Sequence, residues 1–270
     1  MSFEYTNCDT VSPSESLTSL NLVDIPKYGY QLRAADSKAQ YNAPQYAFIQ
    51  NSSASLDSQS QCVIQFDVPA DLKPSILLYY KLTNFYQNHR RYVNSLDADQ
   101  LKGKHRTVDD LRKGDCKPVA VEGDKVIYPC GLIANSLFNG NRELLVSTMA
   151  ANAEIAPDTF SSLTLLNPAA GASNEYAMSE KNIAWPGEAK KYTAAPDYEL
   201  SEIVPPPNWR ARYPDGYTES HPPPNLKENE HFQNWMRTAG LPTFTKLYSR
   251  NDADQLLKGR YQIVVSMSGS

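Results

Sequence analysis

The feature that most restricts how this chain can fold is its set of four cysteines, Cys8, Cys62, Cys116 and Cys130. The last two lie fourteen positions apart, a spacing that suits a covalently closed loop. No Cys-x-x-Cys or His-x-x-x-His pair stands nearby to complete a tetrahedral zinc site. An even count without metal spacing favours two disulfides and an oxidising compartment over buried free thiols. Four cysteines permit three pairings, and the residues alone do not choose among them.

The composition is that of an ordinary globular protein. With 270 residues, 41% of them hydrophobic, the chain is long enough for one large or two small domains, and wholesale disorder is excluded. The net charge of −4 gives no electrostatic reason to expect nucleic acid or an anionic membrane as a partner. No apolar run approaches the roughly 18 residues of a membrane helix. The segment Met1–Tyr5 lacks the basic-then-apolar plan of a signal peptide.

Alternating apolar residues predict several strands. Gln61–Val68 alternates like a half-buried strand, and the β-rich Ile76–Tyr86 is predicted as a long central strand. Further strands are expected at Ile127, Leu132, Leu144–Val146, Leu163–Leu166, Thr243–Ser249 and Arg260–Ser266. Strands outnumber helices and no βαβ rhythm is present. We therefore expect a mainly β (α+β) fold, with antiparallel, β-sandwich-like sheets, a few short helices and long loops.

Two segments have the apolar spacing of helices. Asn88–Lys102 is followed by Gly103, which ends the pattern. Asn225–Ala239 starts with a residue able to cap the N-terminus and continues with an apolar stripe. Residues 168–181, rich in Ala, Gly, Ser and Asn, are typical of an inserted loop. Because no internal repeat and no clean linker is found, residues 1–270 are expected to form a single domain.

The sequence contains none of the catalytic motifs that residue spacing alone can identify. None of the four histidines, His89, His105, His221 and His231, has a second histidine three or four positions on, so a zinc hydrolase is poorly supported. The chain has no Gly-x-Ser-x-Gly elbow, no phosphate loop and no dinucleotide-binding glycine motif. We expect no enzymatic activity, no cofactor and no metal.

Two basic clusters are candidates for contact with a partner. His89–Arg91 has tyrosines on both sides, whereas Lys102–Arg106 has none. Solvated loop charge is the plainer interpretation of both clusters. The alternative is docking onto acidic loops, because Arg beside Tyr makes a good interface anchor.

A second candidate contact follows the proline arm Pro205–Pro207. Such an arm forms a stiff polyproline II piece that loses little entropy on binding, although it also suits a mere spacer. It leads into an aromatic-basic segment that ends at Tyr213. With the first basic cluster, the predicted partner surface comprises Tyr86, His89, Arg90, Arg91, Tyr92, Trp209, Arg210, Arg212 and Tyr213. The competing interpretation is that these residues lock the domain's own loops together.

Four separated stretches carry a resemblance. They are Tyr79–Tyr92, Tyr128–Asn139, Ile203–Trp209 and Asn234–Pro242. In order and content they resemble the lumenal domain of the cell division control protein 50 family, and the likeness runs from about residue 5 to about residue 265. Family members place a membrane helix on each side of this domain, and the chain has neither. They also usually have a glycosylation acceptor just after the Leu-Phe-Asn element, where this chain has none.

The resemblance implies a non-catalytic β-subunit of a phospholipid flippase, a type-IV P-type ATPase. Such a subunit binds exoplasmic loops of the ATPase, helps it leave the endoplasmic reticulum and supports its transport cycle. The implied location is lumenal or extracellular, on a membrane protein of the endoplasmic reticulum, Golgi, endosome or plasma membrane. The alternative is a carbohydrate- or ligand-binding extracellular β-domain that stacks sugars on exposed Trp and Tyr. A secreted hydrolase is a third and weaker candidate.

Two covalent features complete the prediction. We predict a Cys116–Cys130 disulfide because this closure is local, and cross-linking a loop of about 15 residues is worth roughly 3 kcal/mol. Cys8–Cys62 then follows by elimination and ties the N-terminal segment to a strand. Asn51 begins the one Asn-x-Ser/Thr acceptor of the chain, within a Ser-rich stretch, and is the predicted glycosylation site.

Overall fold

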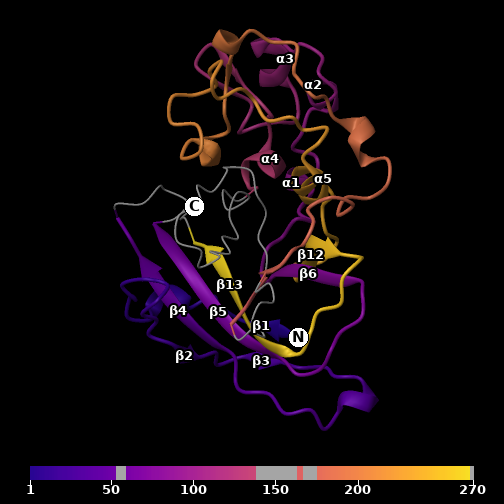
Figure 1. Cartoon of the computed structure of the whole chain (residues 1–270). Helices are drawn as coiled ribbons and strands as arrows, with labels where there is room; N and C mark the ends of the chain where they lie inside the picture. Colours follow the sequence, from indigo (N-terminus) through magenta and orange to yellow (C-terminus); the bar gives the residue numbers. More distant parts are fainter. Residues whose placement is uncertain (53–58, 138–162, 167–174, 268–270) are drawn as a thin grey trace. The chain divides into compact units, whose positions relative to one another are not determined.

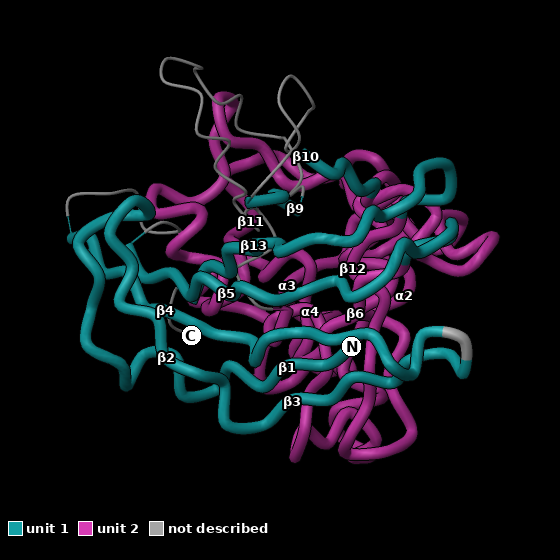
Figure 2. Tube along the Cα trace, turned by 60° about the horizontal axis from the view of Figure 1, so that its bottom comes forward, with its two compact units in different colours: residues 1–76, 140–179, 251–269 teal, residues 77–139, 180–250, 270 magenta. Residues whose placement is uncertain are grey.

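The computed structural model describes residues 1–52, 59–137, 163–166 and 175–267. The chain divides into two compact units, each built from separated segments (Figures 1 and 2). Unit 1 contains residues 1–76, 140–179 and 251–269, and unit 2 contains residues 77–139 and 180–250. Residues 144–146, predicted as a strand, lie outside the described part of the chain.

Unit 1 is built on a six-stranded antiparallel sheet. Its strands, in spatial order, are β10 (Glu175–Tyr176), β9 (Leu163–Leu165), β13 (Gly259–Ser266), β5 (Ser60–Val68), β4 (Gln45–Gln50) and β2 (Val23–Asp24). β5 lies between β13 and β4, and most of its residues are buried on both faces. A small sheet of β1 (Ser2–Phe3) and β3 (Tyr28–Gly29) packs on it, with the Phe3 ring 4.9 Å from that of Phe66. The short helices of this unit are η1 (Cys8–Thr10) and η2 (Ala34–Asp36).

Unit 2 has less regular structure. β6 (Ile76–Leu82) pairs with β12 (Phe244–Asn251), and β8 (Lys125–Ile127) pairs with β7 (Val121–Glu122) and, in parallel, with β11 (Ile203–Val204). Its α-helices are α1 (Arg90–Val93), α2 (Ala98–Leu101), α3 (Val108–Lys113), α4 (Leu132–Asn135) and α5 (Glu230–Met236). Its 3-10 helices are η5 (Glu188–Lys191), η6 (Leu200–Glu202) and η7 (Pro207–Trp209). The core is aromatic: Trp209, Trp235 and Phe232 are at most 1% exposed.

The predicted mainly β (α+β) class is confirmed, since the six-stranded sheet and the pairs β1–β3 and β7–β8 are antiparallel, and the helices are short. Within the described residues, none of the helices has the length and apolar character needed to cross a membrane.

Several predicted elements were wrong in detail. β6 is not central: it pairs with one strand, and its residues alternate between half-buried and exposed. Leu132 begins a helix and not a strand. Asn88–Lys102 forms two one-turn helices instead of one. The late helix starts at Glu230, after the cap residue Asn229, whose side chain accepts a hydrogen bond from the Phe232 N–H at 2.9 Å.

Candidate partner-binding surface

The four stretches that carry the family resemblance all lie within unit 2. They meet at α4, a helix of one turn. The indole N–H of Trp235 donates to the Ile133 carbonyl at 2.8 Å, and that of Trp209 donates to the Ala134 carbonyl at 3.1 Å. Each carbonyl also accepts a local hydrogen bond, from the Ser136 hydroxyl and from the Leu137 N–H, so each indole adds a second donor to the end of a short helix. The motif tryptophans are therefore fixed by the fold.

The first residues of α4 are fixed by contacts with the segment Tyr92–Ser95. Gly131 has φ +102°, and a Cβ at this position would collide with the Ser95 carbonyl oxygen. The Ser95 hydroxyl accepts from the Leu132 N–H at 2.8 Å, and Tyr92 shares a 2.7 Å hydrogen bond with Ser136. A side chain at position 131 would therefore require the backbone near Ser95 to move.

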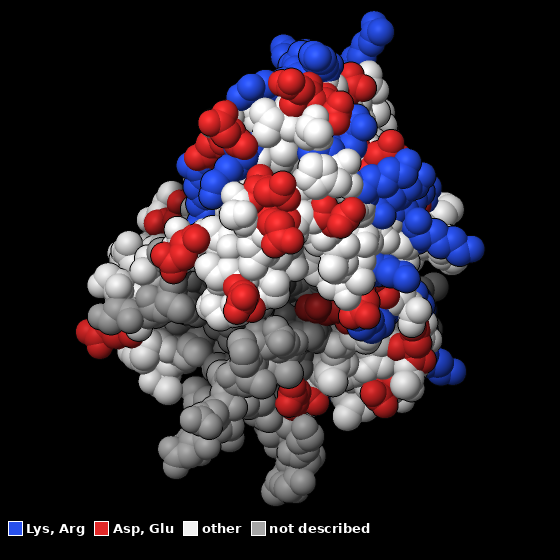
Figure 3. All heavy atoms as spheres, turned by 90° about the horizontal axis from the view of Figure 1, so that it is seen from above, with Lys and Arg blue, Asp and Glu red and all other residues white. Residues whose placement is uncertain are grey.

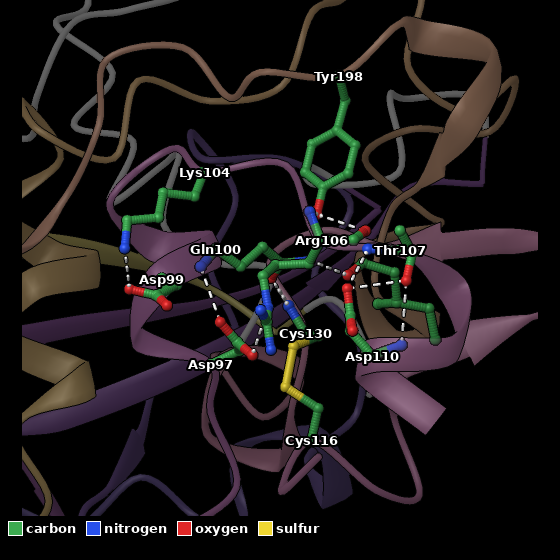
Figure 4. A network of polar contacts seen from close by, with 11 residues as sticks. Asp97, Asp99, Gln100, Lys104, Arg106, Thr107, Asp110, Cys116, Cys130 and Tyr198 are labelled. Atoms are coloured by element: carbon green, nitrogen blue, oxygen red, sulfur yellow. Dashed lines mark hydrogen bonds and ion pairs between the residues drawn. A yellow bond between two sulfur atoms is a disulfide. The ribbon is translucent and has the colours of Figure 1, made fainter. Parts of the chain in front are cut away.

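The structure contains both of the predicted disulfides. Cys8–Cys62 joins η1 to β5 in unit 1. Cys116–Cys130 lies in the core of unit 2 beside Gln100 (Figure 4). The Gln100 side-chain oxygen accepts from the Cys130 N–H at 2.9 Å, and its amide nitrogen donates to the Ile127 carbonyl at 3.0 Å. This disulfide has a structural role.

In the second basic cluster, Lys104 and Arg106 are paired with acidic residues of their own unit. Lys104 lies 2.9 Å from Asp99, and Arg106 lies 3.2 Å from Asp97 (Figure 4). The hydrogen bond from Lys104 is the main cause that lowers the pKa of Asp99. On the face drawn in Figure 3, basic and acidic side chains lie next to one another. Because these two cations already have counter-ions, we expect them to contribute little to the binding of an acidic partner.

The first basic cluster is different. Arg90 and Arg91 are exposed on α1, and neither forms an ion pair with any residue that the structure describes. His89, also exposed, occupies the N-terminal cap of α1, where its carbonyl accepts the N–H groups of Tyr92 and Val93. These two arginines are solvated charges available to a partner.

An exposed apolar pair accompanies these arginines. Tyr86 is 59% exposed and Leu241 is 68% exposed. Their loops run side by side, because Phe85 N–H donates to the Pro242 carbonyl at 3.0 Å and Ala239 N–H donates to the Gln87 side chain at 2.9 Å. The Asn88 amide adds a 3.1 Å bond to the Gly240 carbonyl.

We call Tyr86, His89, Arg90, Arg91 and Leu241 the basic-aromatic surface. Leu241 is not among the residues predicted from the sequence. The signal that marks it is an apolar side chain between Gly240 and Pro242, two residues that hold a chain in a loop.

Of the remaining predicted interface residues, Trp209 is buried, while Arg210, Arg212, Tyr213 and Tyr92 contact their own unit, and their place at a partner surface stays a prediction. Trp209 is 1% exposed and its ring packs against Phe232 at 6.1 Å. Arg212 stacks on Trp209 at 5.6 Å, and Arg210 pairs with Glu122. Tyr213 packs against the core with its ring 4.8 Å from that of Tyr217, and Tyr92 is half-buried. An indole that donates to a core carbonyl cannot also face a partner.

Asn51 lies in unit 1 and is exposed, with its backbone N–H donating to the Gln59 carbonyl at 2.8 Å. An exposed acceptor in a loop is compatible with an attached glycan. Its glycosylation stays a prediction.

Comparisons with known proteins agree with the sequence resemblance. The LEM3 (ligand-effect modulator 3) family / CDC50 family matches residues 1–268. The phospholipid-transporting ATPase accessory subunit CDC50 of Chaetomium thermophilum is 38% identical, over 98% of this chain and 62% of that protein. The accessory subunit CRF1 of Saccharomyces cerevisiae is 39% identical, over 95% of this chain and 57% of its own. Cell cycle control protein 50A of Mus musculus is 35% identical, over 69% of this chain and 48% of its own. The chain thus spans less than two thirds of these relatives.

Proposed function

Because the chain belongs to the LEM3 (ligand-effect modulator 3) family / CDC50 family, we propose that it is the lumenal or extracellular part of a non-catalytic accessory subunit of a phospholipid-transporting ATPase. Two supporting relatives are named as accessory subunits of such ATPases and not as the ATPase itself. Phosphate and lipid chemistry then belong to the partner, a type-IV P-type ATPase. Membrane helices outside the described residues attach the subunit to the bilayer.

The observation that supports a docking role most directly is the unpaired charge on the basic-aromatic surface. Arg90 and Arg91 are exposed without a counter-ion among the described residues, beside Tyr86 and Leu241. Arg and Tyr are enriched at the centres of protein interfaces, where an apolar neighbour helps to exclude water. The surface therefore fits an exoplasmic loop of the ATPase that carries carboxylates next to an apolar side chain.

The wider role follows from the family. We infer that this contact accompanies the ATPase out of the endoplasmic reticulum and supports its transport cycle, in the manner of a chaperone that stays bound. The two disulfides suit the oxidising lumen through which such a complex passes.

The test is co-purification of the full-length subunit with its ATPase from a membrane extract. Arg90→Ala with Arg91→Ala should reduce the recovered complex about tenfold, which corresponds to roughly 1.4 kcal/mol. Thermal stability should hardly change, because substitutions on exposed sites usually stay within about 0.5 kcal/mol.

A matched control removes the same charge elsewhere on unit 2. Lys113→Ala with Lys125→Ala deletes two exposed cations on other elements, α3 and β8, and should leave the complex intact. If the control pair weakens the complex as much as the arginine pair does, net charge and not this surface governs association. If the arginine pair has no effect, the interface lies elsewhere.

A further inference from the structure

Trp185 differs from the other two tryptophans of the chain. Trp209 and Trp235 are at most 1% exposed, whereas Trp185 is 60% exposed. It lies on the loop Glu180–Gly187, at the wall of a hollow of about 720 Å³ within unit 2. That volume falls in the range of small-molecule sites. A large apolar ring kept in water at the wall of a hollow calls for an explanation.

Side chains of α5 and β12 hold the backbone of the loop that carries Trp185. One carboxylate oxygen of Glu230 accepts the N–H groups of Ile183 at 2.8 Å and Ala184 at 3.0 Å. Arg250 donates to the Asn182 carbonyl at 2.9 Å. Charge-assisted bonds of this kind are stronger than neutral ones, so the loop has a defined shape before any ligand arrives.

The ring itself is oriented from one side. The guanidinium of Arg237 lies 3.5 Å from the centroid of the Trp185 ring. Because this cation covers one face, the exposed area of the indole belongs to the other face and the edges. Asn182 (φ +61°) and Gly187 (φ +88°) bracket the segment with left-handed backbone, a conformation that costs energy at an asparagine.

The lining of the hollow restricts the class of ligand. Lys181, Lys227 and Arg250 bring positive charge, but Glu228 and Glu230 bring carboxylates to the same walls. The charges of this lining nearly balance, which favours neither a multiply charged anion nor a cation, and the arginine on the indole further disfavours a quaternary ammonium. The ligand should instead combine an apolar face with groups that both donate and accept hydrogen bonds.

A sugar ring has this combination. The C–H groups of one pyranose face are weakly positive and complement the negative face of an indole, while the hydroxyls bond to carboxylates, amides and ammonium groups. We propose that the Trp185 hollow is a carbohydrate-binding site, with a pyranose stacked on Trp185 and its hydroxyls bonded to Lys227 and Glu228. The site is separate from the basic-aromatic surface and does not depend on it.

The first experiment is a glycan array probed with the labelled 270-residue chain. The array carries mannose, N-acetylglucosamine, galactose and sialic acid glycans together with N-linked core oligosaccharides. Wild type should bind at least one of these classes. Trp185→Ala should weaken that binding at least tenfold, and Tyr79→Ala should not, since Tyr79 is a 50% exposed aromatic of the same unit that does not line the hollow.

The second experiment uses the tryptophans themselves. Because only Trp185 is exposed, acrylamide should quench mainly its fluorescence, and the bound glycan should protect it. Arg90→Ala with Arg91→Ala should bind the glycan as wild type does, which separates this site from the docking surface.

The proposal is overturned if the folded wild type binds no glycan at millimolar concentration, or if Trp185→Ala binds as well as wild type. It is also overturned if Trp185→Ala lowers only recovery of the ATPase, because Trp185 is then a contact with protein.

Discussion

At the scale of single residues, Lys246 is a buried cation that binds carbonyl groups at the end of α5. It is 7% exposed, and its ammonium donates to the Asn234 carbonyl at 2.7 Å and the Arg237 carbonyl at 2.5 Å. Both carbonyls lie at the end of α5, where a helix presents unpaired acceptors and the negative end of its dipole. Burial first, and then the charge of Arg237, lowers the pKa of Lys246 from 10.5 to about 8.

This lowered pKa predicts a rise of stability with pH. Between about pH 8 and 10.5 the unfolded chain still binds the proton that folded Lys246 has released, so the free energy of unfolding increases, by at most about 1.4 kcal/mol per pH unit. Lys246→Met should remove this slope. Urea unfolding of both proteins at pH 7.5, 8.5 and 9.5 measures it. Parallel curves for the two proteins would contradict the assignment. Above pH 10 the tyrosines whose pKa is raised by burial, such as Tyr80, act in the opposite direction.

At the scale of elements, the period of the apolar pattern predicted where β5 and β13 lie in the sequence, but not which strands pair with one another. β5 and β13 lie where alternation predicted them. Yet β12 and β13, adjacent in the sequence, belong to different sheets, because pairing depends on long-range packing that no local pattern contains. The cap of the late helix lies four residues beyond its expected position, at Asn229, since the Asn225 side chain accepts from Lys227 and Glu228 and forms a turn instead.

The lack of long-range information in a local pattern also explains which residues of the candidate surface could be predicted from the sequence. Arg90 and Arg91 were identified because charge beside Tyr is visible in the sequence. Trp209 was misplaced because tryptophan is frequent both in cores and at interfaces, and only the hydrogen bond to Ala134 distinguishes the two. Leu241 was missed because its neighbour Tyr86 is distant in the sequence and near only in the fold.

Gly131, at the start of α4, allows a prediction with a matched control. Gly131→Ala adds a Cβ at φ +102° where the Ser95 carbonyl leaves no space, while Gly123→Ala adds one at φ +58° with nothing within 4 Å. The second change should cost about 1–2 kcal/mol, the strain of left-handed backbone alone. The first should cost roughly 2 kcal/mol more, because α4 must shift away from Ser95. Urea denaturation of the two variants measures the difference, and equal losses would show that α4 tolerates the shift.

At the scale of the whole molecule, the chain passes between its two units four times, and each unit contains one disulfide. Unit 2 carries the family stretches, the basic-aromatic surface and the Trp185 hollow, whereas both ends of the described chain belong to unit 1. Neither unit is a continuous piece of sequence, so neither can be cut out at a single linker. A chain with this connectivity restricts how far one unit can open while the other stays folded.

We therefore predict that the two units unfold together, as one domain. The tryptophans offer a selective probe, because all three lie in unit 2, while the largest sheet lies in unit 1 and contributes to far-ultraviolet circular dichroism. Thermal unfolding followed by tryptophan fluorescence and by circular dichroism should give coincident curves, and the calorimetric enthalpy should equal the van't Hoff enthalpy. If fluorescence changes at one temperature and dichroism at another, the units are independent domains. Docking on unit 2 would then leave unit 1 unstabilised, whereas a single transition means that a partner bound at the basic-aromatic surface stabilises the entire chain.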